Sequence, residues 1–366
     1  MGTEKKLSVI VPLFNVEQYA ERAAKSIFSQ AFDGLEVVLV DDGSTDNSLG
    51  AFEEFLMDAS NEQNLSVVSI RQKNEGLSSA RNAGIRAASG EYVMFLDGDD
   101  VLLSGGLNSI YAGLAARKTD VLMGKYVIMQ EKGREIWPEY SFPAASSASA
   151  ARAAIYSEVL DSVWNAWRYV CKRDFLLDNE LFFIPGIICE DMEWTPRVLR
   201  AANSIAFTDA PFYGYYYNRP GCITRTYVGK RIKDVNSIAA DSVEKYIDEP
   251  YGEALTYRLI RESFYCMSRY CLCSRAERKE LRPAIERAIE QYHHSPSAII
   301  RLFLTTKNIV PIYIWSVMLF LAKSARGALK SILGPITLRR RATVPSNGIE
   351  SAIRLTETKE SPASNK

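Results

Sequence analysis

The segment FLDGDD, residues 95–100, places three carboxylates where an apolar run ends. Side chains alternate along an extended strand, so Asp97 and Asp99 project from the same side. Gly98 between them removes side-chain bulk where a ligand could approach closely. Neighbouring carboxylates repel one another, and a hard cation such as Mg²⁺ or Mn²⁺ relieves that repulsion by binding one or two of them together with phosphate oxygens. The segment indicates a divalent cation site, with a solvated turn as the alternative, because D-G-D is also common in turns.

A second pair of acids, Asp41 and Asp42, stands at the end of another apolar run, in VVLVDDGSTDNS. A carboxylate there can accept a hydrogen bond from the edge of a nucleobase ring or from a ribose hydroxyl. Asp-Gly and Ser-Thr-Asp are also ordinary turn and helix-cap residues. Alone, this pair predicts a turn and a binding site equally.

A third pair, Glu190 and Asp191 in CEDMEW, stands at the start of an expected helix. Repulsion by Glu190 is expected to raise the proton affinity of Asp191, as it does for close carboxylates. Such a group suits general base catalysis. The alternative is structural, because acids are favoured at helix N-termini in any case.

The elements that must position these acids alternate in type through residue 100. Apolar, β-branched runs predict strands, and apolar residues three or four positions apart predict helices between them. The expected strands are 7–12, 35–42, 65–72 and 91–100, and the expected helices are 17–30, 48–60 and 77–90. This alternation is typical of βαβ units, so we expect an α/β fold with a mainly parallel sheet. Ligands of such sheets bind at the carboxyl ends of the strands, here residues 12–15, 41–44, 72–76 and 97–100.

The organisation changes further along the chain. A helix over 107–120, a strand over 121–130, a helix over 186–202 and an aromatic strand over 204–218 are expected, and only helical patterns follow residue 227. We expect three parts, a domain over 1–226 with halves at 1–103 and 104–226, a helical and basic region over 227–335, and a polar tail over 336–366 whose composition predicts disorder.

Four segments together resemble a known family. LSVIVPLFNVEQY, VVLVDDGSTDNS, NEGLSSARNAGI and GEYVMFLDGDD are similar, in order and spacing, to the motifs of family-two glycosyltransferases with a GT-A fold. The resemblance is strong over residues 7–103 and continues more weakly to about residue 225. It implies a Rossmann-like, mainly parallel sheet with flanking helices, followed here by the helical C-terminal region.

The resemblance also implies roles for individual residues. Asp42 would meet the base, Asp97 would lie near the ribose and donor sugar, and Asp99 would be the principal metal ligand. Asp191 would be the catalytic base. The remaining residues expected around the nucleotide are Pro12, Asn15, Glu17, Asp41, Asn74, Gly76, Arg81 and Gly98.

Two further groups of residues come with the resemblance. Arg219 and Thr224, in YNRPGCIT, would hold the diphosphate, although Cys222 stands where the family often has Ser. Trp164, Asn165 and Glu190 would lie near the acceptor. Sugars stack on aromatic faces, so the tryptophans of VWNAW and Trp194 could form an acceptor platform. Core packing is the alternative for these rings.

The implied reaction is metal-dependent, inverting transfer of one sugar, a hexose or N-acetylhexosamine, from a nucleoside-diphosphate sugar to a hydroxyl. UDP is the expected nucleotide, and the expected acceptor is a glycan or lipid-linked glycan in bacterial surface polysaccharide synthesis. The metal would act as Lewis acid and Asp191 as base. A nucleotidyltransferase, which would want a glycine-rich basic loop after the first strand, and a non-catalytic nucleotide-sugar-binding or membrane scaffold protein are the alternatives. A nucleic acid partner is not expected.

Charge is unevenly spread, although Lys plus Arg and Asp plus Glu both number 44. No acid occurs from residue 291 to 349, and residues 308–322 are apolar but short for a bilayer span, which needs about 20 residues. Bases interleaved with apolar residues predict that 296–341 lies on an anionic membrane. We therefore expect a cytoplasmic protein, peripheral at the cytoplasmic face of the inner membrane.

The N-terminal residues predict a strand and not a signal peptide, so the six cysteines are expected to be reduced. Cys266, Cys271 and Cys273 cluster, and His293 and His294 follow, but paired C-x-x-C spacing is missing. Helix packing, and not zinc binding, is the prediction for these cysteines.

Overall fold

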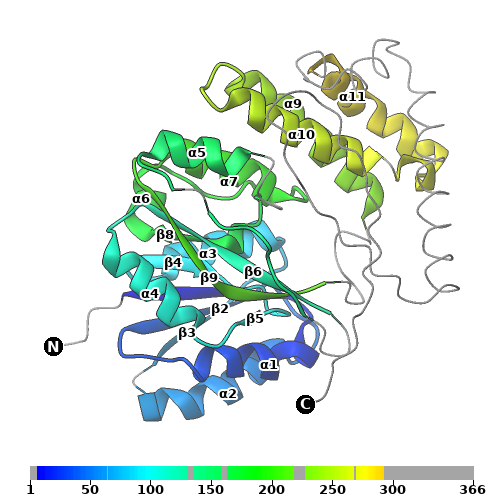
Figure 1. The fold of residues 1–366 in the computed structure, drawn as a ribbon. Helices are drawn as coiled ribbons and strands as arrows, with labels where there is room; N and C mark the ends of the chain where they lie inside the picture. The colour runs from blue at the N-terminus through cyan, green and yellow to red at the C-terminus, as the bar shows by residue number, and fades with distance from the viewer. Residues whose placement is uncertain are drawn as a thin grey trace, which may run out of the picture.

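A computed structural model of the chain describes residues 6–63, 65–130, 135–142, 144–157, 163–217, 227–267 and 269–291. A nine-stranded sheet runs through the molecule, helices lie above and below it in the view of Figure 1, and further helices extend from one side. The strand order is β3-β2-β1-β4-β8-β6-β9-β5, with β7 paired to β6.

The first four strands form the predicted parallel part of the sheet. They are β1 (Leu7–Leu13), β2 (Leu35–Asp41), β3 (Ser66–Arg71) and β4 (Tyr92–Phe95). Every residue of β1, β2 and β4 is buried, which explains why these strands are mostly apolar. The chain moves outward from β1 to β3 and then returns to place β4 on the other side of β1. This reversal creates a topological switch point between β1 and β4.

The connecting helices bury their apolar faces as predicted. They are α1 (Glu17–Phe28), α2 (Ser48–Gln63) and α3 (Leu77–Ala87). On α1, Ala23 and Ile27 are fully buried, and Tyr19 packs at the margin of the core. Burial of a side chain such as Ile27 contributes about 1.5–3 kcal/mol. On α3, a Cβ at Gly84 would overlap the Ile10 side chain, so glycine lets this helix approach β1 closely.

The sheet is mixed beyond β4, and not mainly parallel as expected for the whole sheet. Its other strands are β5 (Val101–Leu102), β6 (Val121–Met129), β7 (Glu135–Ile136), β8 (Tyr169–Lys172) and β9 (Ile205–Tyr216). β8 runs antiparallel to both β4 and β6, whereas β6 and β9 are parallel. The four-residue β8 carries no sequence signal for its direction, which is set by its neighbours.

The helices of the second half cover this mixed part. They are α4 (Gly106–Ala116), α5 (Ala148–Tyr156), the short 3-10 helix η2 (Ala166–Arg168), α6 (Arg173–Asp178) and α7 (Glu190–Ala201). The expected helix over 186–202 starts at Glu190, so the Glu190–Asp191 pair does occupy a helix N-terminus.

Helices alone follow β9 in the described chain. They are α9 (Val228–Tyr246), α10 (Gly252–Met267), the 3-10 helix η3 (Tyr270–Leu272) and α11 (Arg275–Gln291). α9 packs against α10 and α11 and also contacts α7. Buried residues of α9 and α10 belong to the same core cluster as the sheet. The domain boundaries predicted at 226 and 335 stay predictions.

A buried polar network locks the amino edge of the sheet. Glu36, which is 1% exposed, accepts hydrogen bonds from the hydroxyls of Ser8 (2.6 Å) and Ser89 (2.7 Å) and from the Ser89 backbone N–H (2.7 Å). A buried carboxylate held in this way is satisfied within the protein.

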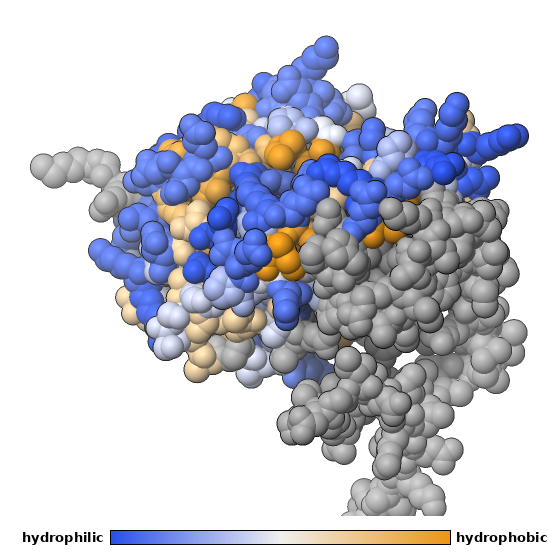
Figure 2. All heavy atoms as spheres, turned by 90° about the horizontal axis from the view of Figure 1, so that it is seen from above, coloured by the Kyte–Doolittle hydropathy of each residue, from blue (hydrophilic) through white to orange (hydrophobic). Residues whose placement is uncertain are grey.

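Seen from above, the described surface is mostly hydrophilic, with a smaller apolar area near the middle of the view (Figure 2).

The basic and apolar segments singled out in the sequence, 296–341 and 308–322, and the tail over 336–366 lie outside the described residues. Within the described chain, no helix combines the length and apolarity that a membrane crossing requires. The membrane-surface association of 296–341 stays a prediction.

Candidate active site

The carboxyl edge of the parallel strands brings together most of the predicted residues. Pro12 and Asp41 lie at the ends of β1 and β2, and Asp97 follows β4 across the switch point. In open α/β sheets, ligands bind in the crevice at this position. The topology therefore supports a ligand site at the edge that the sequence predicted.

Asn15 and Glu17 join the segment after β1 to the segment after β2. Asn15 has a positive φ of 52°, and its Oδ1 accepts hydrogen bonds from the backbone N–H (2.8 Å) and hydroxyl (3.1 Å) of Thr45. Glu17 Oε2 accepts a hydrogen bond from the Asn47 N–H (2.9 Å). Both residues are exposed, so their predicted contact with a nucleotide is compatible with these bonds.

Asp42 organises the segment after β3. It is 3% exposed, and its carboxylate accepts hydrogen bonds from Gln72 Nε2 (2.8 Å) and from the backbone N–H groups of Glu75 (2.9 Å) and Gly76 (2.8 Å). Asp41, also buried, accepts a hydrogen bond from the Ser44 N–H (2.9 Å). The sequence predicted either a turn or a binding site at Asp41 and Asp42, and these hydrogen bonds show that the turn is present.

The same segment leads into α3 through an open position. Gly76 has a φ of 89°, which favours glycine, and no heavy atom lies within 4 Å of where its Cβ would be. Asn74 is exposed, and its backbone N lies so close to Gly43 that a Cβ at Gly43 would approach it to 2.8 Å. Asn74 and Gly76 thus border open space at the carboxyl edge, where the sequence placed a nucleotide.

The three carboxylates after β4 have separate surroundings. Asp97 Oδ1 pairs with Arg81 (2.8 Å), and the Asp97 side chain is 25% exposed. Asp100 is buried and accepts hydrogen bonds from the Tyr213 hydroxyl (2.7 Å) and the Tyr216 N–H (2.8 Å). Burial, aided by the charge of Asp97, raises the pKa of Asp100 well above its usual value. Asp100 is therefore a structural residue that ties this segment to β9.

Asp99 is partly exposed, and its backbone carbonyl accepts a hydrogen bond from Arg22 (2.5 Å). Asp97 and Asp99 offer oxygen donors at a partly open edge, which fits a hard divalent cation. Among the described residues, no three His, Cys, Asp or Glu side chains cluster as a complete metal site. A cation here would complete its coordination with ligand oxygens and water, as Mg²⁺ usually does.

Gly98 is explained by packing against β1. A Cβ there would lie 2.9 Å from Leu13 Cδ2, 3.0 Å from Val16 Cγ2 and 3.2 Å from the Pro12 carbonyl. The close approach that excludes a side chain at Gly98 is therefore to the chain itself. The approach of a nucleotide to the same residue stays a prediction.

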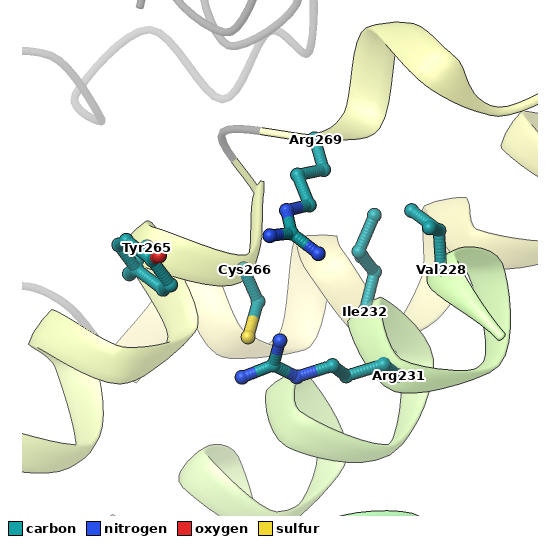
Figure 3. A pocket seen from close by; sticks show the side chains of 6 residues that line it. All are labelled: Val228, Arg231, Ile232, Tyr265, Cys266 and Arg269. Carbon is teal, nitrogen blue, oxygen red and sulfur yellow. The ribbon is translucent and has the colours of Figure 1, made fainter. Parts of the chain in front are cut away.

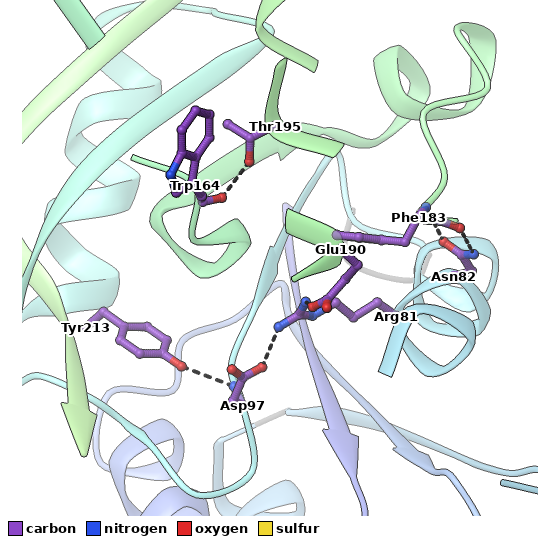
Figure 4. Close-up of polar contacts among 8 residues, drawn as sticks. All are labelled: Arg81, Asn82, Asp97, Trp164, Phe183, Glu190, Thr195 and Tyr213. Atoms are coloured by element: carbon purple, nitrogen blue, oxygen red, sulfur yellow. Dashed lines mark hydrogen bonds and ion pairs between the residues drawn. The ribbon is translucent and has the colours of Figure 1, made fainter. Parts of the chain in front are cut away.

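Arg81 links the two acidic groups from its place on α3. It is 2% exposed, and its guanidinium pairs with Glu190 Oε1 (2.5 Å) as well as with Asp97 (Figure 4). The rings of Phe95 and Phe183 lie 5.6 and 5.3 Å from it, a cation–π arrangement. The carboxylates raise the pKa of Arg81 despite its burial. Arg81, predicted to border the nucleotide, acts in this structure through the carboxylates it holds.

Asp191 stands beside this pair at the first turn of α7. Burial, and next the charge of Glu190, raise the pKa of Asp191 to about 7, while Arg81 and the Met192 N–H oppose the shift. The residue before the pair, Cys189, has a left-handed φ of 62°, which turns the chain into α7. A partly exposed carboxyl group with this pKa can take up a proton near neutral pH.

Helix α9 anchors the turn that precedes α7, which the sequence did not predict. Lys230 Nζ donates a hydrogen bond to the Gly186 carbonyl (2.6 Å), and the Ile188 N–H donates one to Asp234 Oδ2 (2.8 Å). Lys230 and Asp234 also pair with each other (2.7 Å). The sequence offered one signal for this anchor, an acid, Asp234, one helical turn after Lys230. It could not identify the group that Asp234 binds, because the Ile188 N–H lies 46 residues away.

The tryptophan rings expected to form an acceptor platform are buried in this structure. Trp164, Trp167 and Trp194 are 5%, 3% and 0% exposed. Trp194 stacks on Phe183 at 4.5 Å, and the Trp164 carbonyl accepts a hydrogen bond from Thr195 (2.5 Å; Figure 4). These rings pack in the core, and the role of Trp164 near an acceptor stays a prediction.

Three predicted residues remain to be placed. Asn165 precedes η2 and is partly exposed, so its role near an acceptor stays a prediction. Arg219 and Thr224 lie outside the described residues.

The wound sheet and its switch point place the chain among the α/β proteins whose ligands bind at the carboxyl edge of the strands. Residues 8–186 match the family model described as Glycosyl transferase family 2, so this part of the chain is a family-two glycosyltransferase domain. The family resemblance of the four sequence motifs is thereby confirmed, as is the GT-A fold.

Similar proteins include Glycosyltransferase GlyA of Streptococcus pneumoniae serotype 4, which is 27% identical over 237 residues. The match covers 63% of this chain but only 33% of GlyA, so the chain spans about a third of that relative's length.

Two solved structures share the fold. Staphylococcus aureus TarS 1–349 in complex with UDP-GlcNAc superposes with a TM-score of 0.66 at 22% identity, covering 88% of this chain and 92% of that chain. The mannosyltransferase PcManGT from Pyrobaculum calidifontis, in complex with GDP-Man and Mn2+, has a TM-score of 0.52 at 18% identity, covering 90% and 87%.

Proposed function

We propose that the chain transfers one sugar from a nucleoside-diphosphate sugar to a hydroxyl of a glycan or lipid-linked acceptor, with inversion and with a divalent cation. One observation carries the proposal. Asp191, with a pKa of about 7, is connected through Glu190 and Arg81 to Asp97 at the edge where a donor would bind. Family membership supports the choice of reaction.

At the donor side, Asp99 and Asp97 would hold the cation. When bound, the ion supplies Lewis-acid stabilisation of the leaving diphosphate. Arg81 keeps Asp97 oriented through its 2.8 Å ion pair, so this carboxylate keeps a fixed position at the edge. The open position at Gly76 leaves space for the nucleotide at the beginning of α3.

At the acceptor side, Asp191 would accept the proton of the attacking hydroxyl. Its raised pKa makes it a stronger base than an ordinary aspartate, while most of it is ionised above pH 7. Attack from the side of Asp191, with the diphosphate leaving on the other side, inverts the anomeric carbon. Glu190 assists by raising the pKa of Asp191 and by pairing with Arg81.

The nature of the donor is a further part of the proposal. UDP is the expected nucleotide, in line with the UDP-GlcNAc held by TarS, whereas PcManGT holds GDP-Man and Mn2+. Both relatives have the same fold at low identity, so they support a nucleotide sugar more strongly than any particular base. Surface polysaccharide synthesis at the inner membrane is the expected setting.

The test is a screen of purified full-length protein against UDP-, GDP- and dTDP-sugars, with Mn²⁺ and with EDTA. We expect release of nucleoside diphosphate with one nucleotide class, only with metal, and loss of it in Asp99→Ala. Asp191→Asn should lower transfer by about 10²- to 10⁴-fold while nucleotide binding is retained.

Glu193→Gln is the matched control, because Glu193 lies on the same helix but pairs with Arg197 (2.7 Å). It should keep transfer near the wild-type rate. Full transfer by Asp191→Asn would refute the assignment of the base. Binding of a nucleotide sugar without transfer to any acceptor would favour the non-catalytic alternative.

A further inference from the structure

Helix α1 binds the main chain of the acidic segment after β4 through two polar side chains. Arg22 and Ser26 are four residues apart, so they lie on the same face of the helix. Arg22 Nη2 donates a hydrogen bond to the Asp99 carbonyl (2.5 Å), and the Leu102 N–H donates one to Ser26 Oγ (3.0 Å). The helix therefore restrains the main chain on both sides of Asp100, and the proposed reaction assigns no role to these contacts.

The guanidinium of Arg22 is itself held in place by aromatic rings. Its central carbon lies 3.5 Å from the centre of the Tyr216 ring and 5.2 Å from that of Tyr19, which are cation–π arrangements. The Arg22 Nε is buried and has no hydrogen-bond partner in the described chain. Because stacking restricts the plane of the guanidinium, Nη2 keeps a fixed direction toward Asp99.

The three acids of the segment are restrained in different ways. Asp97 pairs with Arg81 through its carboxylate, and the Asp100 carboxylate bonds to β9. The contact of Arg22 with Asp99 goes to the main chain, so it restrains the backbone without using the carboxylate oxygens. Groups that orient a metal ligand from outside the coordination shell contribute to the affinity for the ion.

The charge of Arg22 acts in the opposite sense. A positive charge beside a bound cation repels it and lowers its affinity. Arg22 and Asp99 are both partly exposed, so solvent screens this repulsion, whereas the hydrogen bond is direct. We therefore expect orientation of Asp99 to outweigh repulsion of the ion.

We propose that Arg22 is a positioning residue for the divalent cation, acting through the main chain of Asp99. The inference rests on the cation of the proposed function and adds a residue of α1 to that site. It also predicts a sign. Removal of Arg22 weakens cation binding if the arginine orients Asp99, and strengthens it if repulsion dominates.

The test measures Mn²⁺ binding by the full-length protein from the electron paramagnetic resonance signal of the free ion. Titrations are run with UDP, GDP or dTDP present, and the Mn²⁺ bound by each nucleotide alone is subtracted. In Arg22→Met, the dissociation constant for Mn²⁺ should increase about 10-fold or more. Arg22→Lys keeps a cationic donor but loses the planar stack on Tyr216, so its affinity should lie between those of wild type and Arg22→Met.

Lys25→Met is the matched control. Lys25 is an exposed residue of α1 that pairs with Glu21, so its loss removes the same charge from the same helix without a contact to Asp99. This variant should bind Mn²⁺ as wild type does.

Activity provides a second measurement. At saturating Mn²⁺, transfer by Arg22→Met should return close to the wild-type rate, because the substitution changes the affinity for the ion and not kcat. A fall in kcat that added Mn²⁺ does not restore would indicate a structural role and overturn the assignment.

Tighter or unchanged Mn²⁺ binding in Arg22→Met would also overturn it. If Arg22→Met does not fold, Arg22→Lys decides: weaker binding than wild type supports the assignment, and equal binding overturns it. A wild-type protein that binds no Mn²⁺ with any of the three nucleotides would refute the cation of the proposed function and this inference together. Binding by wild type that is unchanged in the variants would refute this inference alone.

Discussion

Two arginines near the start of α7, the buried Arg81 and the partly buried Arg231, have very different surroundings. Arg81, from α3, pairs with the carboxylates of Asp97 and Glu190. Arg231, from α9, contacts the neutral thiols of Cys189 and Cys266. Arg81 therefore lies in a network of ion pairs, whereas Arg231 lies among the side chains of α9 and α10 without a close ion pair in the described chain (Figure 3).

The difference between the two arginines lies in their ion pairs. A buried cation with two carboxylates is satisfied, and it fixes the positions of the groups around it. Arg231 forms no close ion pair within the described chain, and only the more distant charge of Glu262 acts on it. The comparison predicts that the two arginines respond in different ways to the same substitution.

The largest expected effect is that of Arg81→Met. Its removal leaves Asp97 and Glu190 without their buried partner, which costs about 3–5 kcal/mol when one member of such a pair is lost. Urea denaturation should show this loss of unfolding free energy. Arg86→Met on the same helix is the control, since Arg86 is exposed and stacks on Phe182 at 4.3 Å. A change below about 1 kcal/mol for Arg81→Met would break the comparison.

The next effect concerns the other anchor of the turn, Asp234. In Asp234→Ala, the Ile188 N–H and Lys230 lose their acceptor, and we expect a loss of about 1–3 kcal/mol in unfolding free energy. Because the turn leads to Asp191, kcat should decrease while the donor KM stays near wild type. Asp241→Ala tests an exposed acid of the same helix, which pairs with Arg287. An equal fall in both variants would show that the effect is not specific to the turn.

Arg231→Met is expected to have a small effect on stability. Because Arg231 has no close carboxylate partner in the described chain, an apolar replacement leaves no buried acid unpaired, and the unfolding free energy should change by less than about 1 kcal/mol. Measured beside Arg81→Met under the same conditions, it gives the contrast directly. Equal losses in the two variants would mean that Arg231 is as well compensated as Arg81.

The smallest effect is a shift in pH dependence. Asp191 must be ionised to act as a base, so log kcat/KM should fall as pH decreases below about 7. Glu190→Gln removes a neighbouring negative charge, lowers the pKa of Asp191 and should move this limb to lower pH by up to about one unit. Glu193→Gln should leave the limb unchanged. A limb that stays in place or moves upward in Glu190→Gln would contradict the assignment.

The same raised pKa has a consequence for stability. The unfolded chain releases the Asp191 proton near its ordinary pKa of 3.8, whereas the folded chain retains it to about 7. The contribution of Asp191 to stability is therefore greatest below about pH 4 and decreases as pH rises toward 7.

Sequence patterns predicted the parallel strands well, because their apolar runs report burial on both faces. The acids at Asp41, Asp97 and Asp99 were predicted from their position after such runs. The pairing of Arg81 with Glu190 was not predictable, because 109 residues separate them and the sequence around each gives no indication of the other. The tryptophans were equally ambiguous, because a ring that stacks on a sugar and a ring that fills a core have the same composition signal.

Asp100 connects the segment after β4 to the end of β9 by hydrogen bonds. The Asp100 carboxylate accepts a hydrogen bond from the N–H of Tyr216, the last residue of β9. The residue before Asp100, Asp99, is the proposed ligand of the cation. A shift of Asp99 on binding the ion would therefore reach the end of β9 through the carboxylate of the next residue, Asp100.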